Sequence, residues 1–351
     1  MTQVSAMLED TLLWPAEWEP HSATWLAWPH QKADWPGKFQ PIPWVWCEIV
    51  RWLSQVETVR LIVPPGAAET VRGMLKQSHA DLTCVELLDL PTDRVWLRDS
   101  GGQTVRMAGG GRALINWKFT AWAKYRNHRK DALVGDCMAS HLALHLVQPV
   151  SLAGRMVLEG GAIDSDGQGT LLTTEECLLS NIQQRNRGLG KAEYEQAFHR
   201  YLGATHTLWL DKGIIGDDTH GHVDDLARFI APGRVACVRE SNLADPNHAI
   251  LEENHRRLRT FTDACGRRLE VVDLPMPSPL FFDGTRLPAS YANFYIANGL
   301  VLVPTFNDPA DCLALGILAE QFPGRKVVGI HALDLVWGLG TLHCLSQQEC
   351  A

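Results

Sequence analysis

The chain has 351 residues, of which 46% are hydrophobic and 21% are charged, and its formal net charge is −8. This balance is typical of a globular protein with a large buried core. The negative charge and the lack of a basic stripe argue against nucleic acid as a partner, and they are compatible with a cationic substrate.

Cysteine usage and the N-terminal residues indicate the compartment. The nine cysteines are an odd number, and no two have the C-x-x-C spacing of a zinc knuckle or redox motif. Residues 1–10 lack the basic and apolar regions of a signal peptide, and no apolar run approaches the roughly 18 residues of a membrane span. We therefore expect a reduced, cytoplasmic protein that does not enter a membrane.

Strands and helices alternate in the first third of the chain. Hydrophobic periodicity, with Pro and Gly as stops, predicts five elements, namely strands at 24–28, 58–63 and 84–88 and helices at 47–56 and 67–77. A polar segment from Trp96 to Gly102 follows them. A hairpin then joins strands at 104–107 and 113–117 through glycines at 109–111.

The same order of helix, strand, loop and hairpin recurs through the rest of the chain. Helices are predicted at four places, residues 132–146, 192–202, 249–265 and 310–322. A strand follows each of them, at 150–152, 207–210, 269–273 and 326–330. Hairpin turns are predicted at 166–169, 232–233 and 298–299. The last of these is Asn298-Gly299, a strong hairpin signal between strands at 291–296 and 300–303.

These elements form a unit of about sixty residues that is repeated five times. The fifth unit ends at Cys344 without a hairpin partner, so we expect the strand at 24–28 to supply it and to close a ring. A closed ring leaves no sheet edge exposed. The sequence therefore predicts one α/β domain over residues 1–351, built from five similar units.

Equivalent loops of such a ring converge on one axis, and they carry polar residues of catalytic type, namely Asp99, Glu159, His222, Asp224 and Cys344. Cys344 follows a Gly-rich approach, which suits a nucleophile because glycine allows close contact with a ligand. A protonated His222 nearby would lower the pKa of the thiol, and it can act as acid and base. Carboxylates match the planar fork of a guanidinium. The set predicts attack of sulfur on a guanidinium held between carboxylates.

Other interpretations of these residues remain open. A metal-dependent hydrolase could hold zinc through a histidine pair and carboxylates, namely His220, His222, Asp217, Asp218 and Asp224. A ring whose central acids capture a cation without chemistry is the non-enzymatic alternative, and a silent Cys344→Ser change would favour it. Taken by itself, Cys344 could also be a buried structural cysteine.

Two tryptophans and one histidine are further candidates. Trp96 lies three residues before Asp99, so it can wall the pocket and stack on a cation, an interaction of about 0.5–2 kcal/mol. Trp122 is a second candidate for substrate contact. His343 adjoins the nucleophile, but in an extended segment it points to the opposite face, so we expect a structural role. The other eight cysteines are also expected to be structural.

Eight short motifs are spread over nearly the whole chain, at residues 7–10, 15–21, 96–101, 159–161, 174–179, 221–224, 289–299 and 343–344. Together they resemble agmatine deiminase, a family of the guanidine-modifying superfamily with bacterial peptidylarginine deiminases as close relatives. The Glu159-Gly-Gly motif alone would not be specific. The resemblance implies a five-bladed α/β propeller, a homodimer, and neither a metal nor an organic cofactor.

The resemblance also implies a role for each core residue. Cys344 is the nucleophile, and Asp99 and Asp224 hold the guanidinium. Glu159 assists in substrate holding and proton transfer, and His222 is the acid and base. Loss of ammonia would leave a covalent thiouronium for water to hydrolyse. Such a hydrolase of C–N bonds in linear amidines converts agmatine to N-carbamoylputrescine, in putrescine and polyamine biosynthesis.

The chain departs from the family pattern in three loops. Leu339 and Thr341 stand where the family has glycine and asparagine, Thr120 replaces another asparagine, and the residues around Arg187 differ. Because such loops recognise the substrate tail, the alternative function is a deiminase of another guanidine, either peptidylarginine or a small derivatised guanidine.

Overall fold

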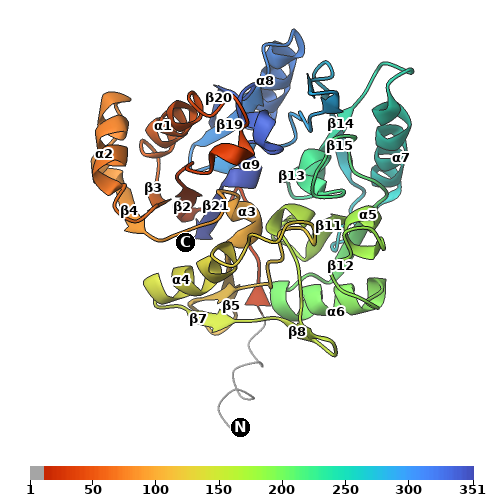
Figure 1. Ribbon diagram of the computed structural model, residues 1–351. Coiled ribbons are helices and arrows are strands. Elements are labelled where there is room, and N and C mark those ends of the chain that lie inside the picture. The colour runs from red at the N-terminus through yellow and green to blue at the C-terminus, as the bar shows by residue number, and fades with distance from the viewer. Residues whose placement is uncertain (1–11) are drawn as a thin grey trace.

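The computed structural model describes residues 12–351, and the prediction that residues 1–10 hold no signal peptide lies outside that range. The described chain is a mixed α/β fold, with the longer helices around the outside of several small sheets (Figure 1). The short helices α3 (Leu97–Ser100) and α9 (Leu342–Leu345) lie near the middle of that view and pack against each other. None of the described helices has the length and apolarity needed to cross a bilayer.

Within residues 12–351 the strands form five sheets of three or four strands and two short ribbons. One four-stranded sheet holds β21 (Gln347–Cys350), β2 (His21–Ala27), β3 (Thr58–Val63) and β4 (Val85–Asp89); the other holds β1 (Leu12–Leu13), β5 (Gln103–Met107), β6 (Arg112–Ile115) and β7 (His145–Val147). The three-stranded sheets hold β10 (Ile163–Ser165), β11 (Thr170–Thr174) and β12 (His206–Leu210); β13 (Ala227–Ala231), β14 (Arg234–Arg239) and β15 (Glu270–Pro275); and β18 (Tyr295–Ala297), β19 (Leu300–Thr305) and β20 (Lys326–His331). The ribbons are β8 (Val150–Ser151) with β9 (Gly154–Arg155), and β16 (Phe281–Phe282) with β17 (Thr285–Arg286).

The five sheets repeat one pairing pattern. An antiparallel pair is followed by a strand parallel to its second member, as in β5–β6–β7 and β10–β11–β12. A parallel neighbour requires a crossover connection, which is usually helical. The crossover helices are α1 (Ile42–Leu53), α2 (Ala68–Gln77), α4 (Val134–His141), α5 (Glu175–Leu179), α6 (Lys191–Leu202), α7 (Pro246–Thr260) and α8 (Ala310–Gln321). The predicted recurrence of helix, strand, loop and hairpin is therefore confirmed in the order of the elements.

The two ends of the described chain meet in one sheet. Strand β21 pairs antiparallel with β2, so that Gln347 lies opposite Trp25. This confirms the predicted pairing of the N-terminal strand with the last unit. Because the pairing begins only three residues after Cys344, it also fixes the segment that carries this cysteine.

The helix predicted at residues 132–146 is wrong at its C-terminal end. Helix α4 ends at His141, and Ala143 has a left-handed backbone with a φ of 50°. Left-handed residues commonly end helices in this way. The strand that follows is β7, which begins at His145 and replaces the strand predicted at 150–152. Residues 150–151 instead pair with 154–155 in a separate ribbon.

The strand predicted at residues 291–296 is shorter than expected, because β18 begins only at Tyr295. The hydroxyl of Ser290 accepts a hydrogen bond from the backbone N–H of Ala292, which makes a turn of the preceding residues. The hairpin predicted at Asn298-Gly299 is confirmed. There Gly299 has a φ of 69°, a conformation that glycine adopts without strain.

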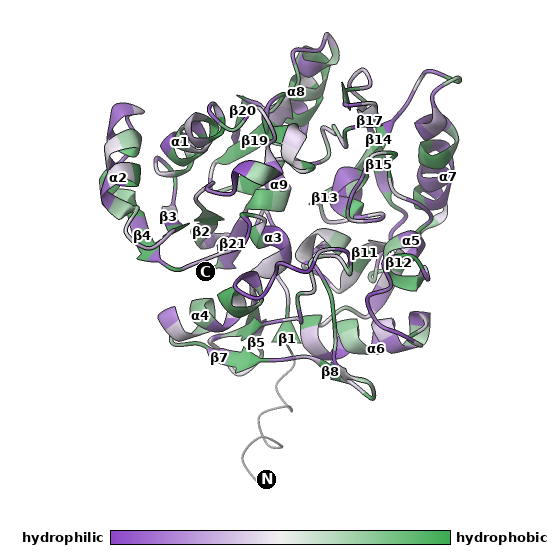
Figure 2. Ribbon diagram, viewed as in Figure 1, coloured by the Kyte–Doolittle hydropathy of each residue, from purple (hydrophilic) through white to green (hydrophobic). Residues whose placement is uncertain are grey.

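Tryptophans fill the core next to the central helices. The ring of Trp35 meets Trp46 edge to face at 5.9 Å between centroids, and it lies 5.8 Å from Trp96. Such aromatic pairs stabilise a core beyond their buried area. The outer helices α6 and α7 carry both hydrophilic and hydrophobic residues, as expected of helices with one buried face (Figure 2). Core packing thus fixes Trp96, which faces the site described next.

Candidate active site

Four of the connections between the sheets bring a polar residue toward a common centre. Asp99 lies between β4 and β5, Glu159 between β9 and β10, His222 with Asp224 between β12 and β13, and Cys344 between β20 and β21. The 3-10 helices at Gly160–Ala162 and Val223–Asp225 carry the second and third connections. They pack against each other, and the first of them also packs against α3. The fold therefore brings the predicted catalytic residues into one region.

Gly161 shows how closely these groups approach one another. A Cβ atom added to it would lie 2.6 Å from His222 Nδ1, 2.9 Å from Asp99 Oδ1 and 3.0 Å from Asp224 Oδ2. No side chain fits there. The second glycine of the Glu159-Gly-Gly motif is thus required by the approach of three titratable groups rather than by a turn.

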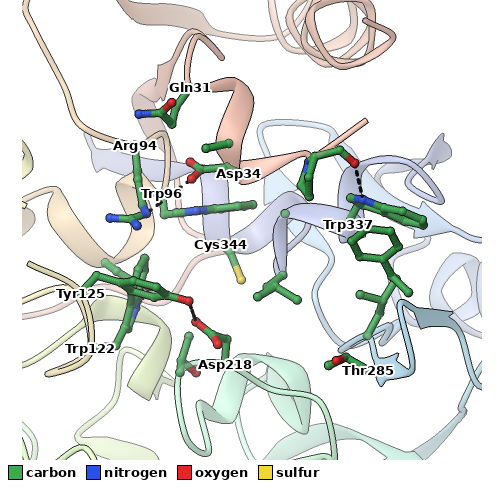
Figure 3. A pocket seen from close by; sticks show the side chains of 18 of the residues that line it. Gln31, Asp34, Arg94, Trp96, Trp122, Tyr125, Asp218, Thr285, Trp337 and Cys344 are labelled. Atoms are coloured by element: carbon green, nitrogen blue, oxygen red, sulfur yellow. Dashed lines mark hydrogen bonds and ion pairs between the residues drawn. The ribbon is translucent and has the colours of Figure 1, made fainter. Parts of the chain in front are cut away.

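A cavity of about 440 Å³ opens beside this centre. Figure 3 shows the sulfur of Cys344 pointing into it near the ring of Trp96, with Trp122 and Tyr125 on one side and Trp337 on the other. The cavity is also lined by four carboxylates, those of Asp34, Asp99, Asp218 and Asp283. Both predicted aromatic residues, Trp96 and Trp122, therefore lie in the wall, and the cavity combines aromatic surface with negative charge.

The backbone before Cys344 is shaped by two unusual positions. Leu339 has a left-handed φ of 68°, although such a conformation favours glycine. Gly340 packs so closely on Trp96 that an added Cβ would lie 2.8 Å from the ring. The chain then forms α9, not the extended segment expected around His343.

The sulfur of Cys344 is surrounded by acidic groups. Its Sγ donates to Asp224 Oδ2 at 3.6 Å. Burial and the charges of Asp224, Asp225 and Asp99 raise the pKa of Cys344 well above its usual value. The prediction that His222 lowers the pKa of this thiol is therefore wrong for the protein without substrate, because burial and three nearby carboxylates raise that pKa. The thiol stays protonated at neutral pH unless a cation offsets these charges.

Asp99 and Asp224 are held by different partners. Asp99 accepts hydrogen bonds from Trp122 Nε1 at 2.8 Å and from the backbone N–H of Gly161 at 3.0 Å. Burial raises the pKa of Asp99 to about 6. Burial alone would also raise the pKa of Asp224, but the hydrogen bond and charge of His343, together with the charges of His222 and Arg228, outweigh burial and lower that pKa. Within residues 12–351, Asp224 Oδ1 has no hydrogen-bond partner, so it can accept from a ligand.

His222 lies between two carboxylates. Its Nδ1 is 3.8 Å from Asp99 Oδ1, and its Nε2 is 3.6 Å from Glu159 Oε2. Burial alone would lower the pKa of His222, but Asp99, Cys177 and Glu159 raise it well above the usual value. Arg185 Nε in turn holds both oxygens of Glu159, at 3.1 and 3.2 Å. A protonated imidazole between two carboxylates can give up a proton and later accept one.

His343 contacts a carboxylate of the site, so the prediction that it points to the opposite face from Cys344 is wrong. Its Nδ1 is 2.7 Å from Asp224 Oδ2, and its Nε2 is 2.9 Å from Glu17 Oε2. A ring that donates to both carboxylates needs hydrogen on both nitrogens. Arg98 and Arg228 hold Glu17 at 3.1 and 2.9 Å. The helical turn of α9 makes this contact possible, because it directs His343 toward the same carboxylate that Cys344 meets.

The zinc ligands considered as an alternative are not brought together. Asp217 accepts from the backbone N–H groups of Gly221 and His222, and His220 Nε2 contacts Ser180 Oγ at 3.0 Å. Asp218 instead bonds to Tyr125 Oη at 2.7 Å. In the described chain, the side chains whose potential ligand atoms lie within 4.8 Å of one another form two other sets, Glu159, Cys177 and His222, and Asp224, Asp225 and Cys344.

Several polar residues of this region were missed by sequence reasoning. Glu17 and Asn293 lie inside the motifs at 15–21 and 289–299, so those motifs could have indicated them. Asp225 follows Asp224 directly, and its pKa is raised well above the usual value by burial and by Asp224. Arg94 lines the cavity, and no pattern in the sequence marked it.

Known proteins resemble this chain in sequence and in structure over nearly its whole length. A protein of Legionella pneumophila subsp. pneumophila named "Putative agmatine deiminase" is 36% identical over 95% of this chain and 94% of its own length. The agmatine deiminase of Enterococcus faecalis has a TM-score of 0.89 at 32% identity, over 97% of this chain and 96% of that one. A cysteine-to-serine variant of C. jejuni agmatine deiminase with substrate bound has a TM-score of 0.86 at 28% identity, over 97% of each chain.

The family assignment follows from these likenesses and from the site. The sequence profile of the Porphyromonas-type peptidyl-arginine deiminases matches residues 13–350, which include all five predicted catalytic residues. The chain therefore belongs to the Porphyromonas-type peptidyl-arginine deiminase family and is a hydrolase that acts on carbon–nitrogen bonds.

Proposed function

We propose that this chain is an agmatine deiminase that hydrolyses agmatine to N-carbamoylputrescine and ammonia through a covalent thiouronium on Cys344. The observation that carries the proposal is the position of the Cys344 sulfur. It points into the cavity (Figure 3), which Asp99 also lines. The sulfur lies 3.6 Å from Asp224 Oδ2. Relatives that match nearly the whole chain are named agmatine deiminases, and one of them binds substrate as a cysteine-to-serine variant.

Binding of the guanidinium explains how a thiol with a raised pKa can react. In this proposal Asp99 and Asp224 accept its N–H groups, and the approach of both carboxylates to Gly161 supports a shared role. Trp96 lines the cavity beside the sulfur and can stack on the cation. The positive charge of the guanidinium then offsets the carboxylates that disfavour the Cys344 thiolate.

The first half of the reaction forms the carbon–sulfur bond. The Cys344 thiol passes its proton to Asp224, and the sulfur attacks the guanidine carbon. Protonated His222 gives its proton to one terminal nitrogen. The bond from carbon to that nitrogen breaks, ammonia leaves, and a thiouronium remains on Cys344.

The second half of the reaction restores the enzyme. Water attacks the thiouronium carbon while His222 takes one of its protons. The carbon–sulfur bond breaks, and Asp224 returns the proton to Cys344. The urea product, N-carbamoylputrescine, leaves after loss of its extra proton, which ammonia accepts. Glu159, fixed by Arg185, holds His222 in position through both steps.

A panel of guanidines tests the proposed substrate. Ammonia release is measured with agmatine, free arginine, a peptide with an internal arginine and methylguanidine, and the agmatine product is identified by mass. Agmatine is expected to react with the highest kcat/KM. One observation favours the alternative of another guanidine, because Lys124 pairs with Asp218 and partly neutralises an acid of the cavity. Inactivity on agmatine with activity on another member of the panel would support that alternative.

We further propose that the five sheets are the blades of one closed α/β propeller and that residues 1–351 form a single domain. The repeated pairing pattern and the β21–β2 pair support this arrangement. The homodimer, the cytoplasmic location, the lack of nucleic-acid binding and the place in putrescine biosynthesis stay predictions.

The pH dependence of kcat/KM for agmatine should show an acidic limb near pH 6. Asp99 must be ionised to hold the guanidinium, and burial raises its pKa to about 6. An acid with a raised pKa becomes protonated as the pH falls through that value, so kcat/KM should fall about tenfold for each pH unit below it. Thermal melting at each pH separates this effect from unfolding. A level profile down to about pH 5 would contradict the role given to Asp99.

Chelators should leave the activity unchanged. No step proposed above uses a metal ion, and His220 and Asp217 are engaged by Ser180 and by backbone N–H groups. The measurement is ammonia release after prolonged dialysis against EDTA, with a mock-dialysed sample as control. Loss of activity that added zinc restores would favour the metal-dependent alternative.

A further inference from the structure

Asn293 lies in the connection between β15 and β18, the one connection for which the sequence analysis named no catalytic residue. Its side chain is fully buried and touches the nucleophile. Nδ2 donates one hydrogen bond to Cys344 Sγ at 3.1 Å and another to Asp225 Oδ1 at 3.0 Å. Both N–H groups of the amide are thus used, and one of them points at the reacting atom.

The orientation of this amide is set by the groups on its other side. Asn293 Oδ1 accepts hydrogen bonds from Thr341 Oγ1 at 2.7 Å and from the backbone N–H groups of His343 and Cys344 at 3.0 and 3.3 Å. A reversed amide would place its NH2 group against these donors and its oxygen against Asp225 and the sulfur. The N–H group is therefore held toward Sγ.

We infer that Asn293 is a catalytic residue, whose carboxamide N–H stabilises the Cys344 thiolate when it attacks and when it leaves the thiouronium. The inference rests on the proposed role of Cys344. Three carboxylates oppose negative charge on the sulfur, those of Asp224, Asp225 and Asp99. Of the histidines nearby, His343 is bonded to Asp224, and His222 lies between Asp99 and Glu159. A hydrogen bond to the charged sulfur is stronger than one to the neutral thiol, so the amide favours the reactive form.

Thr341 fits the same interpretation. It stands where the family pattern has asparagine, and its hydroxyl donates to Asn293 Oδ1. A hydroxyl can supply this one donor, so the departure preserves the orientation of the amide. Thr341 acts through Asn293 and is a positioning residue.

Alkylation of Cys344 by iodoacetamide tests the inference without any substrate. The rate is measured against pH by mass spectrometry of the Cys344 peptide in the wild type, Asn293→Ala and Asn293→Asp. Asn293→Asp keeps the acceptor oxygen for residues 341–344 and loses the N–H donor. Both variants should move the midpoint of the profile up by about one pH unit and lower kcat about thirtyfold.

Ser290→Ala is the matched control, because its hydroxyl bonds in the same buried turn, to the carbonyl of Asp225, without contact to sulfur. It should leave the midpoint unchanged. An Asn293→Asp protein that melts like the wild type with an unchanged midpoint would contradict the inference, even with turnover lost. If neither Asn293 variant folds, Thr341→Val decides: the midpoint should rise by about half a unit, and an unchanged midpoint contradicts the role.

The two proposals can fail separately. Wild-type protein that is inactive on agmatine but shows the midpoint shift in the Asn293 variants would overturn the substrate and keep the role of Asn293 at the sulfur. Full activity of the wild type on agmatine, with no midpoint shift in the Asn293 variants, would keep the substrate and overturn the role of Asn293.

Discussion

Replacing Cys344 by serine is expected to lower agmatine turnover at least about a thousandfold while leaving the fold and agmatine binding in place. A hydroxyl has neither the accessible anion nor the nucleophilicity of a thiol, and serine is close enough in size to keep the contacts with Asn293 and Asp224. Ammonia release measures turnover, and the thermal shift caused by agmatine measures binding.

The same substitution at an exposed cysteine is the control for this variant. Cys312 lies exposed on α8, outside the cavity, so Cys312→Ser should keep wild-type activity. Retention of a tenth of the wild-type rate by Cys344→Ser would contradict covalent catalysis. It would favour a protein that only binds cations, or a hydrolase that activates water by other means.

Agmatine should be preferred over free arginine by at least about a hundredfold in kcat/KM, or roughly 2.7 kcal/mol. Arginine adds a carboxylate to the end where agmatine has only an ammonium group. Asp34 and Asp283 line the cavity, as does Asp218, whose charge Lys124 offsets only in part, so they would attract the second cation and repel that carboxylate. An unpaired charge taken out of water costs several kcal/mol.

Arg94 is the lining residue that could pair with a substrate carboxylate, although sequence reasoning found no such arginine. Its Nη1 is used by Asn127, through the backbone oxygen at 2.9 Å and Oδ1 at 3.1 Å, and its Nε lies 3.7 Å from Asp34. We therefore expect Arg94→Gln to leave the preference for agmatine in place. Comparable turnover of arginine that disappears in Arg94→Gln would show that Arg94 recognises the carboxylate and that the substrate class is different.

Much of the fold could be predicted because residues close together in the sequence determine the turns and the periodic elements between them. The turns at Gly109–Gly111, Asp166–Gly169, Gly233 and Gly299 mark hairpins that are present in the structure. The C-terminal end of the helix predicted at 132–146 was wrong because Ala143 adopts a left-handed conformation, which an alanine side chain does not favour. His145–Val147 is a strand because it pairs with β6, which is a tertiary effect.

Of the candidate site, only the residues with reactive side chains could be predicted from the sequence. Acids, histidine and cysteine stand out in a sequence by their chemistry, and the repeat placed them on equivalent connections. Asn293 is neutral and lies in an aromatic run that is typical of a strand. It reaches the sulfur because these residues form a turn instead, which the sequence pattern did not indicate. Glu17 reaches His343 over most of the chain length. His343 was misjudged because its direction depends on whether α9 is helical or extended.

The most direct test of covalent catalysis is to trap the intermediate on Cys344. Wild-type protein is mixed with excess agmatine, quenched in acid within the first turnovers, digested and analysed by mass spectrometry. The Cys344 peptide is expected to gain the mass of agmatine less ammonia, and the other cysteines to stay unmodified, including Cys177 beside His222. Steady ammonia release with no adduct on Cys344, or with the adduct on another cysteine, would contradict covalent catalysis by Cys344.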